Sequence, residues 1–490
     1  MVNSNLNKDL VEILNLKSVP SLIDGNFVFS QQLFSKYNPI NGEVDYEVCQ
    51  ISKKEYEVVV DSLKNNIYRI ENTNFYERSE IILRASKLIE ENIDILSEIS
   101  SSDSGKTLEE SKGEIYGSIK IANYFGTEWM RSQGEILESS LNGKSTKIVR
   151  HPLGIAGLIT AFNAPLPNIA WKIFPAIFCG NSIILKPSEF VPKIAIALGK
   201  ILISAGLDQK NIAILNGGGK NSLGEWIVDD ENIDIISFTG SLKVGQEIAS
   251  KCSKLFKRYS LELGGKNAII LDKDLNKENA LNYVIQSVFS LSGQRCSAAS
   301  KIFIHDEIYE EILQNLKERI ENDIKNNDIS FTCPLITKES QERILSELND
   351  IKDENKITFE KPSSVDKKTF YVKPTLLINL DLNHKVNKEE LFGPVATVNK
   401  YQNIEEVLDD INNSDFGLTC SLHTNNLNLS EKFTKKAKIG TININLGTFG
   451  SEPHYPFGGF RFSGNGTREP GIDSLDVYSE KKVISIFTQD

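Results

Sequence analysis

The sequence predicts an α/β protein with two sheet-centred lobes, and three observations support this. From residue 155 onward, short apolar runs such as "IAGLIT" and "NSIILKP" alternate with longer stretches of helical pattern. A second set of such strands follows within residues 283–460. The chain has 490 residues, too many for one hydrophobic core. Strands separated by helices of this length indicate parallel βαβ units, and hence a doubly wound sheet in the first lobe.

The N-terminal part of the chain precedes this alternation. Residues 77–101 repeat apolar positions at helical spacing between charges, which predicts one surface helix of a helical layer. Residues 118–145 are less regular, and the segment from Ser132 to Gly154 is typical of turn, strand, turn and strand. In the first lobe we expect helices over 167–180, 192–206 and 241–251.

The second lobe should contain strands around "SKIFIH", "TLLINL", "GPVATVNKY", "CSLHT" and "GTININ". Two α/β lobes with a cleft between them are a natural place for an active site. No internal repeat or low-complexity linker interrupts the pattern.

The bulk composition excludes several classes of protein. It is 40% hydrophobic and 25% charged, as in soluble globular proteins. The net charge of −11, without a clustered basic face, argues against a nucleic-acid partner. The N-terminus lacks a basic segment followed by an apolar one, so we expect no secretory signal. The most apolar region, roughly 153–185, is interrupted by three prolines, Asn163 and Lys172, so we expect no membrane span, and we expect no membrane partner.

The six cysteines lie far apart without a CxxC pair, and the five histidines are equally scattered. This pattern is typical of reduced thiols in a cytoplasm, and we expect the protein to be cytoplasmic. No HExxH motif occurs, so we expect no metal ion.

Two turns at neighbouring strand ends suit a nucleotide cofactor. In "FTGSLKVG" (238–245), Gly240 and Gly245 let backbone approach a phosphate, and Ser241 opens a helix whose N-terminus offers N–H groups. In "LKPSE" (185–189), a lysine and a glutamate follow a strand. An acidic side chain there accepts from both ribose hydroxyls and repels a 2′-phosphate. Either turn alone is also an ordinary surface turn, but the pair favours a cofactor site.

The stretch "LSGQRCSAAS" (291–300) contains a candidate nucleophile. The helical pattern before it breaks at Gly293, so Cys296 should lie in a tight turn at a helix end. Arg295 should favour the thiolate. The alternative is an inert buried thiol, because free cysteines are often buried. In "SLELGGKNA", Glu262 precedes a Gly-Gly turn 34 positions (296 − 262) before Cys296.

These motifs occur together with "TAFNAPLPNIAWKIFPAIFCGNSIILKPSE" and "EELFGPV". In this order, from about residue 37 to 471, the chain strongly resembles the NAD(P)-dependent aldehyde dehydrogenase superfamily. The resemblance implies that family's fold: an NAD-binding domain of residues 1–129 and 153–261, a catalytic domain of residues 262–461, and a small β oligomerisation extension of residues 130–152 and 470–490.

The resemblance also implies a mechanism. Cys296 attacks the aldehyde carbon, and the side-chain amide of Asn163 donates to the developing oxyanion together with the backbone N–H of Cys296. Hydride transfer leaves a thioester, which Glu262 hydrolyses by activating water. Relatives that pass the acyl group to coenzyme A generally lack the glutamate that matches Glu262, so its presence favours hydrolysis to a free acid.

The resemblance implies that the cofactor is NAD and that five side chains bind it. Lys186 and Glu189 hold the adenine ribose, Ser241 contacts the pyrophosphate, Glu390 binds the nicotinamide ribose, and Phe392 packs near the nicotinamide ring. The glutamate at 189 favours NAD, with NADP as an alternative.

The substrate is expected to be a small polar or carboxylate-bearing semialdehyde. Arg295 precedes the nucleophile, and its guanidinium can pair with both oxygens of a carboxylate. It could instead point into an interface or polarise the thiol. Ala164, Pro167 and Ser290 are small residues where many relatives place bulk, and few aromatic residues are expected beside Trp171.

Some features depart from the common family pattern. "PFGGFRFSG" has Arg461 in place of the usual lysine, and the tail "NGTREPG" is similar to that of semialdehyde-oxidising branches. Two further functions stay open: a CoA-acylating aldehyde dehydrogenase and a catalytically silent structural relative.

The family assembles through its two-part extension. In "YSEKKVISIF" (478–487), alternating apolar residues would form an exposed edge if left unpaired, which argues for a partner chain. We expect a homodimer or homotetramer.

Overall fold

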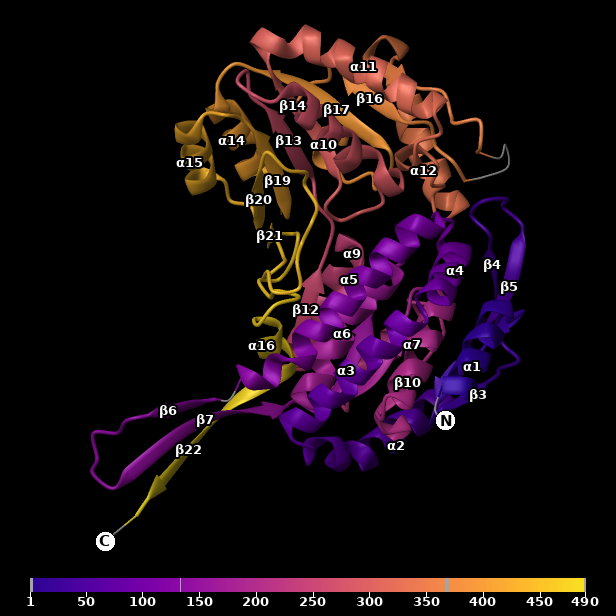
Figure 1. Ribbon diagram of the computed structural model, residues 1–490, viewed down its shortest axis with the longest axis vertical. Coiled ribbons are helices and arrows are strands. Elements are labelled where there is room, and N and C mark those ends of the chain that lie inside the picture. Colours follow the sequence, from indigo (N-terminus) through magenta and orange to yellow (C-terminus); the bar gives the residue numbers. More distant parts are fainter. Residues whose placement is uncertain (1–2, 133, 366–369, 489–490) are drawn as a thin grey trace.

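Two lobes and a projecting arm make up the chain (Figure 1). The computed structural model describes residues 3–132, 134–365 and 370–488, so residue 133 and residues 489–490 of the expected extension lie outside the described residues. Each lobe is centred on a seven-stranded sheet flanked by helices. The α/β class with a doubly wound first sheet is therefore confirmed.

The first sheet has the order β12-β11-β8-β9-β10-β2-β3. Its strands are β2 (Ser21–Ile23), β3 (Asn26–Val28), β8 (Ile155–Ile159), β9 (Ser182–Lys186), β10 (Ile212–Ile214), β11 (Ile235–Thr239) and β12 (Arg258–Glu262). Strands β8 to β12 are parallel, whereas β2 and β3 are antiparallel additions. The chain starts at β8, runs outward through β9 and β10, and returns to β11 on the other side. The switch point, where such sheets bind ligands, therefore lies between β8 and β11.

Alternate side chains of β8 point into two separate cores. Ala156 and Leu158 pack with one set of helices, and Ile155 and Ile159 with the other. The first set is α1 (Asn3–Asn15), α3 (Phe75–Glu91), α4 (Ile93–Ser104), α5 (Leu108–Gly126), α6 (Pro165–Cys179) and α7 (Pro192–Ser204). The second set is α2 (Lys53–Glu71), α8 (Leu223–Asp229) and α9 (Leu242–Lys254).

Two expectations for the helical layer were wrong. The single helix expected over 77–101 is α3 and α4, which meet at Asn92, where the side chain donates to the Leu88 carbonyl and φ is −116°. The irregular pattern after residue 118 belongs partly to α5, which starts at a Thr107–Glu110 capping box. Glycine and serine residues on α5 interrupt its apolar repeat, so the helical pattern was not recognised in the sequence.

The second sheet has the order β15-β16-β17-β14-β13-β19-β20. Its strands are β13 (Asn267–Leu271), β14 (Ala299–His305), β15 (Lys356–Thr358), β16 (Thr375–Ile378), β17 (Val395–Tyr401), β19 (Thr419–His423) and β20 (Thr441–Ile444). Only β15 is antiparallel to its neighbour. The flanking helices are α10 (Lys277–Phe289), α11 (Tyr309–Lys325), α12 (Lys338–Asn349), α13 (Lys385–Lys388), α14 (Ile404–Asn413) and α15 (Leu427–Lys436). All five strands expected for this lobe are present.

The arm is a three-stranded sheet that projects from the body with the C-terminus near its tip (Figure 1). It contains β6 (Glu135–Leu137), β7 (Lys144–Pro152) and β22 (Ser479–Phe487), as the turn-and-strand pattern predicted. No other described strand pairs with the outer edge of β22. Three of its apolar side chains are more than half exposed: Val483, Ile486 and Phe487. The remaining elements are β1 (Ser18–Val19), β4 (Leu33–Tyr37), β5 (Val44–Cys49), β18 (Phe416–Gly417), β21 (Phe460–Arg461) and α16 (Ser474–Tyr478).

All six cysteines are free thiols. Among the described residues, no helix combines the length and the apolar character that crossing a membrane requires.

Candidate active site

A cavity of about 690 Å³ is lined by residues of both lobes. Asn163, which follows β8, and Trp171 on α6 come from the first lobe. Cys296, just before β14, and Thr441, at the start of β20, come from the second. The carboxyl edge of the first sheet therefore faces the amino edge of the second across this space, which we call the reacting cavity.

Cys296 is held in a tight turn between α10 and β14. Leu291, Ser292 and Gly293 all have positive φ, between 53° and 67°. A Cβ at Gly293 would approach the Gly393 carbonyl oxygen to 2.3 Å, so only glycine fits there. Nδ2 of Asn267 donates to the Cys296 carbonyl at 2.6 Å. The strained backbone of residues 291–293 and this hydrogen bond hold the thiol at one place on the cavity wall.

The acidity of the Cys296 thiol differs from the expectation. Burial raises its pKa to about 12, and the charges of Glu262 and Glu390 act in the same direction. Backbone N–H groups of Ser297 and Cys296 oppose this shift. We expected Arg295 to favour the thiolate, but burial and two carboxylates outweigh it. The isolated chain therefore holds the neutral thiol, which must lose its proton before it can react.

Glu262 is the last residue of β12 and is buried, 4% exposed. Neither of its carboxylate oxygens has a hydrogen-bond partner among the described residues. Burial raises its pKa well above the usual value, and the charge of Glu469 adds to the shift, whereas Lys172 and Arg468 oppose it. A Cβ at Gly458 would come within 3.0 Å of Oε1, so the backbone closes tightly over this carboxyl group. A buried, unpaired carboxyl group with a raised pKa is the usual form of a general base.

A buried network beside Glu262 was not anticipated from the sequence. Nζ of Lys172 lies 2.7 Å from Oε2 of Glu469, and both side chains are almost fully buried. The hydroxyls of Ser237 and Tyr478 donate to Oε1 of Glu469 at 2.9 and 3.0 Å. The available signal was Lys172 itself, a single charge within an apolar helix. Such a charge needs a buried partner, and only the fold identifies it.

Arg295 lines the reacting cavity, with its guanidinium 5.3 Å from the centre of the Phe449 ring. Within the part of the chain that the structure describes, no hydrogen bond or ion pair engages this guanidinium. Burial lowers its pKa, while the nearby charges of Glu114 and Glu110 raise it. These two glutamates also line the cavity. The guanidinium is therefore available to bind an anion inside the cavity. The negative charges of Glu114 and Glu110 partly offset its positive charge.

The walls of the reacting cavity are more aromatic than expected. Trp171 is joined by Phe449, Tyr455 and Phe457, and the Trp171 and Phe457 rings lie 5.2 Å apart. Ala164 and Pro167 do line the cavity, whereas the expected Ser290 faces Ser330 instead. The expectation failed because the aromatic residues come from a segment far along the chain.

A second cavity, of about 380 Å³, lies at the switch point of the first sheet, and we call it the cofactor cavity. Lys186, Glu189, Gly240 and Ser241 all line it. Nζ of Lys186 lies 3.4 Å from Oε2 of Glu189, so a donor and an acceptor stand side by side, as a ribose diol requires. Ser241 starts α9, and its side chain makes no capping hydrogen bond. These groups fit a nucleotide with its phosphate at a helix N-terminus.

Three other residues expected at the cofactor do not line this cavity. Gly245 packs against Leu263, where a Cβ would meet the leucine side chain at 2.6 Å. Oε1 of Glu390 accepts from the Gly265 N–H at 3.0 Å, and burial raises the pKa of Glu390 to about 7. Phe392 touches the ring of Phe162, which does line the cavity, at 5.9 Å between centroids. Phe392 thus contacts a residue that lines the cavity, and Glu390 lies beside the turn at Gly265.

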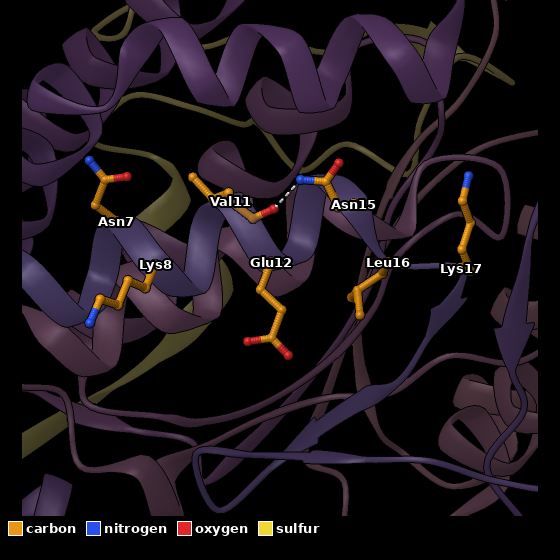
Figure 2. Close-up of a pocket in the computed structure, with 7 residues that line it drawn as sticks. All are labelled: Asn7, Lys8, Val11, Glu12, Asn15, Leu16 and Lys17. Carbon is orange, nitrogen blue, oxygen red and sulfur yellow. Dashed lines mark hydrogen bonds between the residues drawn. The ribbon is translucent and has the colours of Figure 1, made fainter.

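A further depression runs along α1, and its seven lining residues all belong to residues 7–17 (Figure 2). Figure 2 also shows the Asn15 side chain bonded to the Val11 carbonyl, at 2.8 Å. None of the candidate residues lies there, and the side chains are those of an ordinary helix surface.

Comparison with known proteins adds an independent finding. Residues 27–484 match the model of the aldehyde dehydrogenase family. The chain is 29% identical over 483 residues to 3-sulfolactaldehyde dehydrogenase of Priestia aryabhattai, covering 97% of this chain and 99% of that protein. It is 31% identical over 474 residues to betaine aldehyde dehydrogenase of Bacillus subtilis, covering 94% and 96%. A crystal structure of betaine aldehyde dehydrogenase from Staphylococcus aureus in complex with NAD+ superposes with a TM-score of 0.92 and 28% identity, over 99% of this chain and 98% of that one.

Proposed function

Since the chain belongs to the aldehyde dehydrogenase family, we propose that it oxidises a small polar or carboxylate-bearing aldehyde to the acid, with Cys296 as nucleophile and Glu262 as base. It is an oxidoreductase acting on the aldehyde group of donors, and its cofactor is NAD. The lining of the cofactor cavity fits NAD, with Lys186 and Glu189 toward the adenine ribose and Ser241 toward the pyrophosphate.

The chemistry follows from Cys296 and Asn163, which line the reacting cavity, and from Glu262, which does not line it but lies near enough for its charge to act on the thiol. The Cys296 thiol first loses its proton to solvent, because it reacts as the thiolate. The thiolate then forms a C–S bond to the aldehyde carbon, and Nδ2 of Asn163 and the Cys296 N–H donate to the oxyanion. NAD, which Lys186, Glu189 and Ser241 would hold, would supply the acceptor for the hydride that leaves the thiohemiacetal carbon. Glu262 then takes a proton from water, whose oxygen attacks the thioester and displaces the Cys296 thiolate.

The observation that carries the proposal is the shared cavity. Cys296, Asn163 and Arg295 line one space, and Glu262 is close enough for its charge to act on the thiol. The names of the relatives do not determine the charge of the substrate of this chain. One relative is named for an aldehyde with an anionic sulfo group, and another for the cationic betaine aldehyde. The unpaired guanidinium of Arg295 supports the anionic choice.

A substrate panel read as NADH absorbance at 340 nm tests this. We expect kcat/KM for succinic or α-ketoglutaric semialdehyde to exceed that for hexanal, and NAD to be preferred over NADP. A preference for hexanal would contradict the substrate class. Strict dependence on coenzyme A would support the acyl-transferring alternative, and absence of any NADH burst would support a catalytically silent relative.

We also propose the division into an NAD-binding domain (1–129 and 153–261), a catalytic domain (262–461) and an extension (130–152 and 470–490). The exposed apolar edge of β22 supports assembly as a homodimer or homotetramer, and light scattering that gave a monomer would contradict it. The free thiols support a cytoplasmic location.

A further inference from the structure

We propose that Asn168 is a positioning residue that fixes the side-chain amide of Asn163 with its NH₂ group toward the reacting cavity. The inference rests on the proposed function, in which Asn163 stabilises an oxyanion on the substrate. An asparagine amide can do so only with Nδ2 toward the negative charge, because Oδ1 in that place would repel it. The two orientations differ by a simple flip, so something in the protein must select one.

The selection starts at a backbone carbonyl. Nδ2 of Asn168 lies 3.4 Å from the Ala161 carbonyl oxygen and 3.0 Å from Oδ1 of Asn163. A carbonyl oxygen can only accept, so it selects the NH₂ end of the Asn168 amide. That NH₂ group in turn selects Oδ1 of Asn163. Both side chains are more than nine-tenths buried, so water competes little for these bonds.

The other polar atoms of Asn163 are also engaged. Nζ of Lys106 donates to the Asn163 backbone carbonyl and to Glu114. With Oδ1 and the carbonyl oxygen both accepting, Nδ2 is the side-chain group of Asn163 left without a partner among the described residues. Asn163 and Cys296 line the same cavity, so this free donor stands on the wall where the thiol adds to its substrate.

The local helix explains why a side-chain donor matters here. Pro165 and Pro167 occupy the first turn of α6 and lack N–H groups, so this helix N-terminus offers few backbone donors. Asn168 lies one turn into α6, and its N–H donates to the Ala164 carbonyl at 2.9 Å. The helix backbone therefore holds Asn168 rigidly beside Asn163.

Two substitutions of similar size separate positioning from packing. In Asn168→Asp, a carboxylate faces Asn163 and accepts from its NH₂ group, which turns Oδ1 toward the cavity. We expect kcat to fall about 100-fold, as for loss of an oxyanion donor, with little change in KM. In Asn168→Leu, the amide keeps access to both orientations, and we expect a loss of about tenfold or less. A merely structural role predicts that leucine is at least as harmful as aspartate.

The matched test combines these changes with Asn163→Ala. Once the Asn163 amide is absent, Asn168→Asp should cost nothing further, so the double variant should equal Asn163→Ala alone. Thermal unfolding and NAD binding, followed by NADH fluorescence, should stay close to wild type in all variants. Losses that multiply, or an Asn168→Asp variant with wild-type kcat, would overturn the inference.

Hydrolysis of 4-nitrophenyl acetate separates this inference from the proposed function. The Cys296 thiolate adds to the ester carbonyl, 4-nitrophenolate leaves, and water hydrolyses the thioester, with neither cofactor nor aldehyde. If wild type hydrolyses the ester but oxidises no aldehyde, the proposed function fails, and the same variant series on the ester decides the role of Asn168. If wild type does neither, both are overturned.

Discussion

The cofactor cavity and the reacting cavity are built in different ways. The cofactor cavity takes much of its wall from short segments that follow strands of one sheet, at 159–162, 186–190 and 238–241. The reacting cavity draws on both lobes, with contributions as distant as Glu110 and Phe457. Burial shifts the pKa values of Cys296 and Arg295 in the reacting cavity, whereas the Glu189 side chain in the cofactor cavity is about one-third exposed. Substitution of the reacting groups Cys296 and Glu262 should therefore abolish or slow the chemistry, whereas substitution of Arg295 or Glu189 should change the preference for substrate or cofactor.

The largest effect should come from the thiol itself. Cys296→Ser should lower kcat by at least about 10⁴-fold, because a hydroxyl is a far weaker nucleophile and no other group can form the thioester. NAD binding should survive, as judged by NADH fluorescence. Cys49→Ala, at a buried cysteine that lines neither cavity, is the matched control and should keep activity. Turnover retained by Cys296→Ser would remove the thiol from the mechanism.

Glu262→Gln should act on the second half of the reaction. Steady-state turnover should fall by about 10²–10⁴-fold, as for loss of a general base, while a first-turnover burst of NADH remains. Stopped-flow absorbance separates the two phases. An unaltered steady state, or loss of the burst as well, would contradict the assignment of Glu262 to thioester hydrolysis.

The pH dependence of wild type tests the same carboxyl group. Glu262 accepts a proton only when ionised, and its pKa is raised by burial and by the charge of Glu469. Turnover should therefore rise with pH and fall as pH drops through a value above the usual carboxyl range. Glu262→Gln should lack this acid limb in its residual rate. A wild-type profile that stays flat down to the ordinary carboxyl pKa would contradict the raised pKa.

Arg295→Gln should change the choice of substrate. Loss of a charge-assisted hydrogen bond should lower kcat/KM for a carboxylate-bearing semialdehyde by about 10- to 100-fold and leave hexanal within about twofold. Arg295→Lys should lower this kcat/KM by an intermediate factor, since lysine keeps the positive charge but cannot donate two parallel hydrogen bonds to a carboxylate. Equal losses for both aldehydes would mean that Arg295 acts on the thiol or the fold instead.

The smallest effect belongs to the cofactor cavity. Glu189→Gln should lower the NAD:NADP ratio of kcat/KM by about tenfold, because it removes a charge that repels a 2′-phosphate. Glu231→Gln, at an exposed glutamate that does not line the cofactor cavity, should leave the ratio unchanged. An unchanged ratio in Glu189→Gln would place cofactor selection elsewhere.

The sequence predicted part of each cavity: Lys186, Glu189, Gly240 and Ser241 line the cofactor cavity, and Cys296, Asn163, Arg295 and Trp171 line the reacting cavity. Lys186 ends β9, Glu189 follows it, and Ser241 follows β11, and the parallel topology brings these strand ends to one edge of the sheet. Glu390 is expected at the nicotinamide ribose, and the structure adds that its Oε1 accepts from the Gly265 N–H, a contact that the sequence does not reveal. The Lys172–Glu469 pair joins residues 297 positions apart, which no local pattern can predict.

The sequence by itself determined the α/β class through hydrophobic periodicity, and it identified Cys296, Asn163 and Glu262 as candidates through the resemblance of its motifs to a known family. Periodicity and short motifs are local properties of the chain. Only the tertiary structure decided which groups are buried together: burial raises the pKa of the Cys296 thiol, Glu262 has no hydrogen-bond partner among the described residues, and Asn168 donates to Oδ1 of Asn163. Electrostatic interactions and hydrogen bonds depend on distance in space and on exclusion of water. Neither distance nor water exclusion can be obtained from the local sequence.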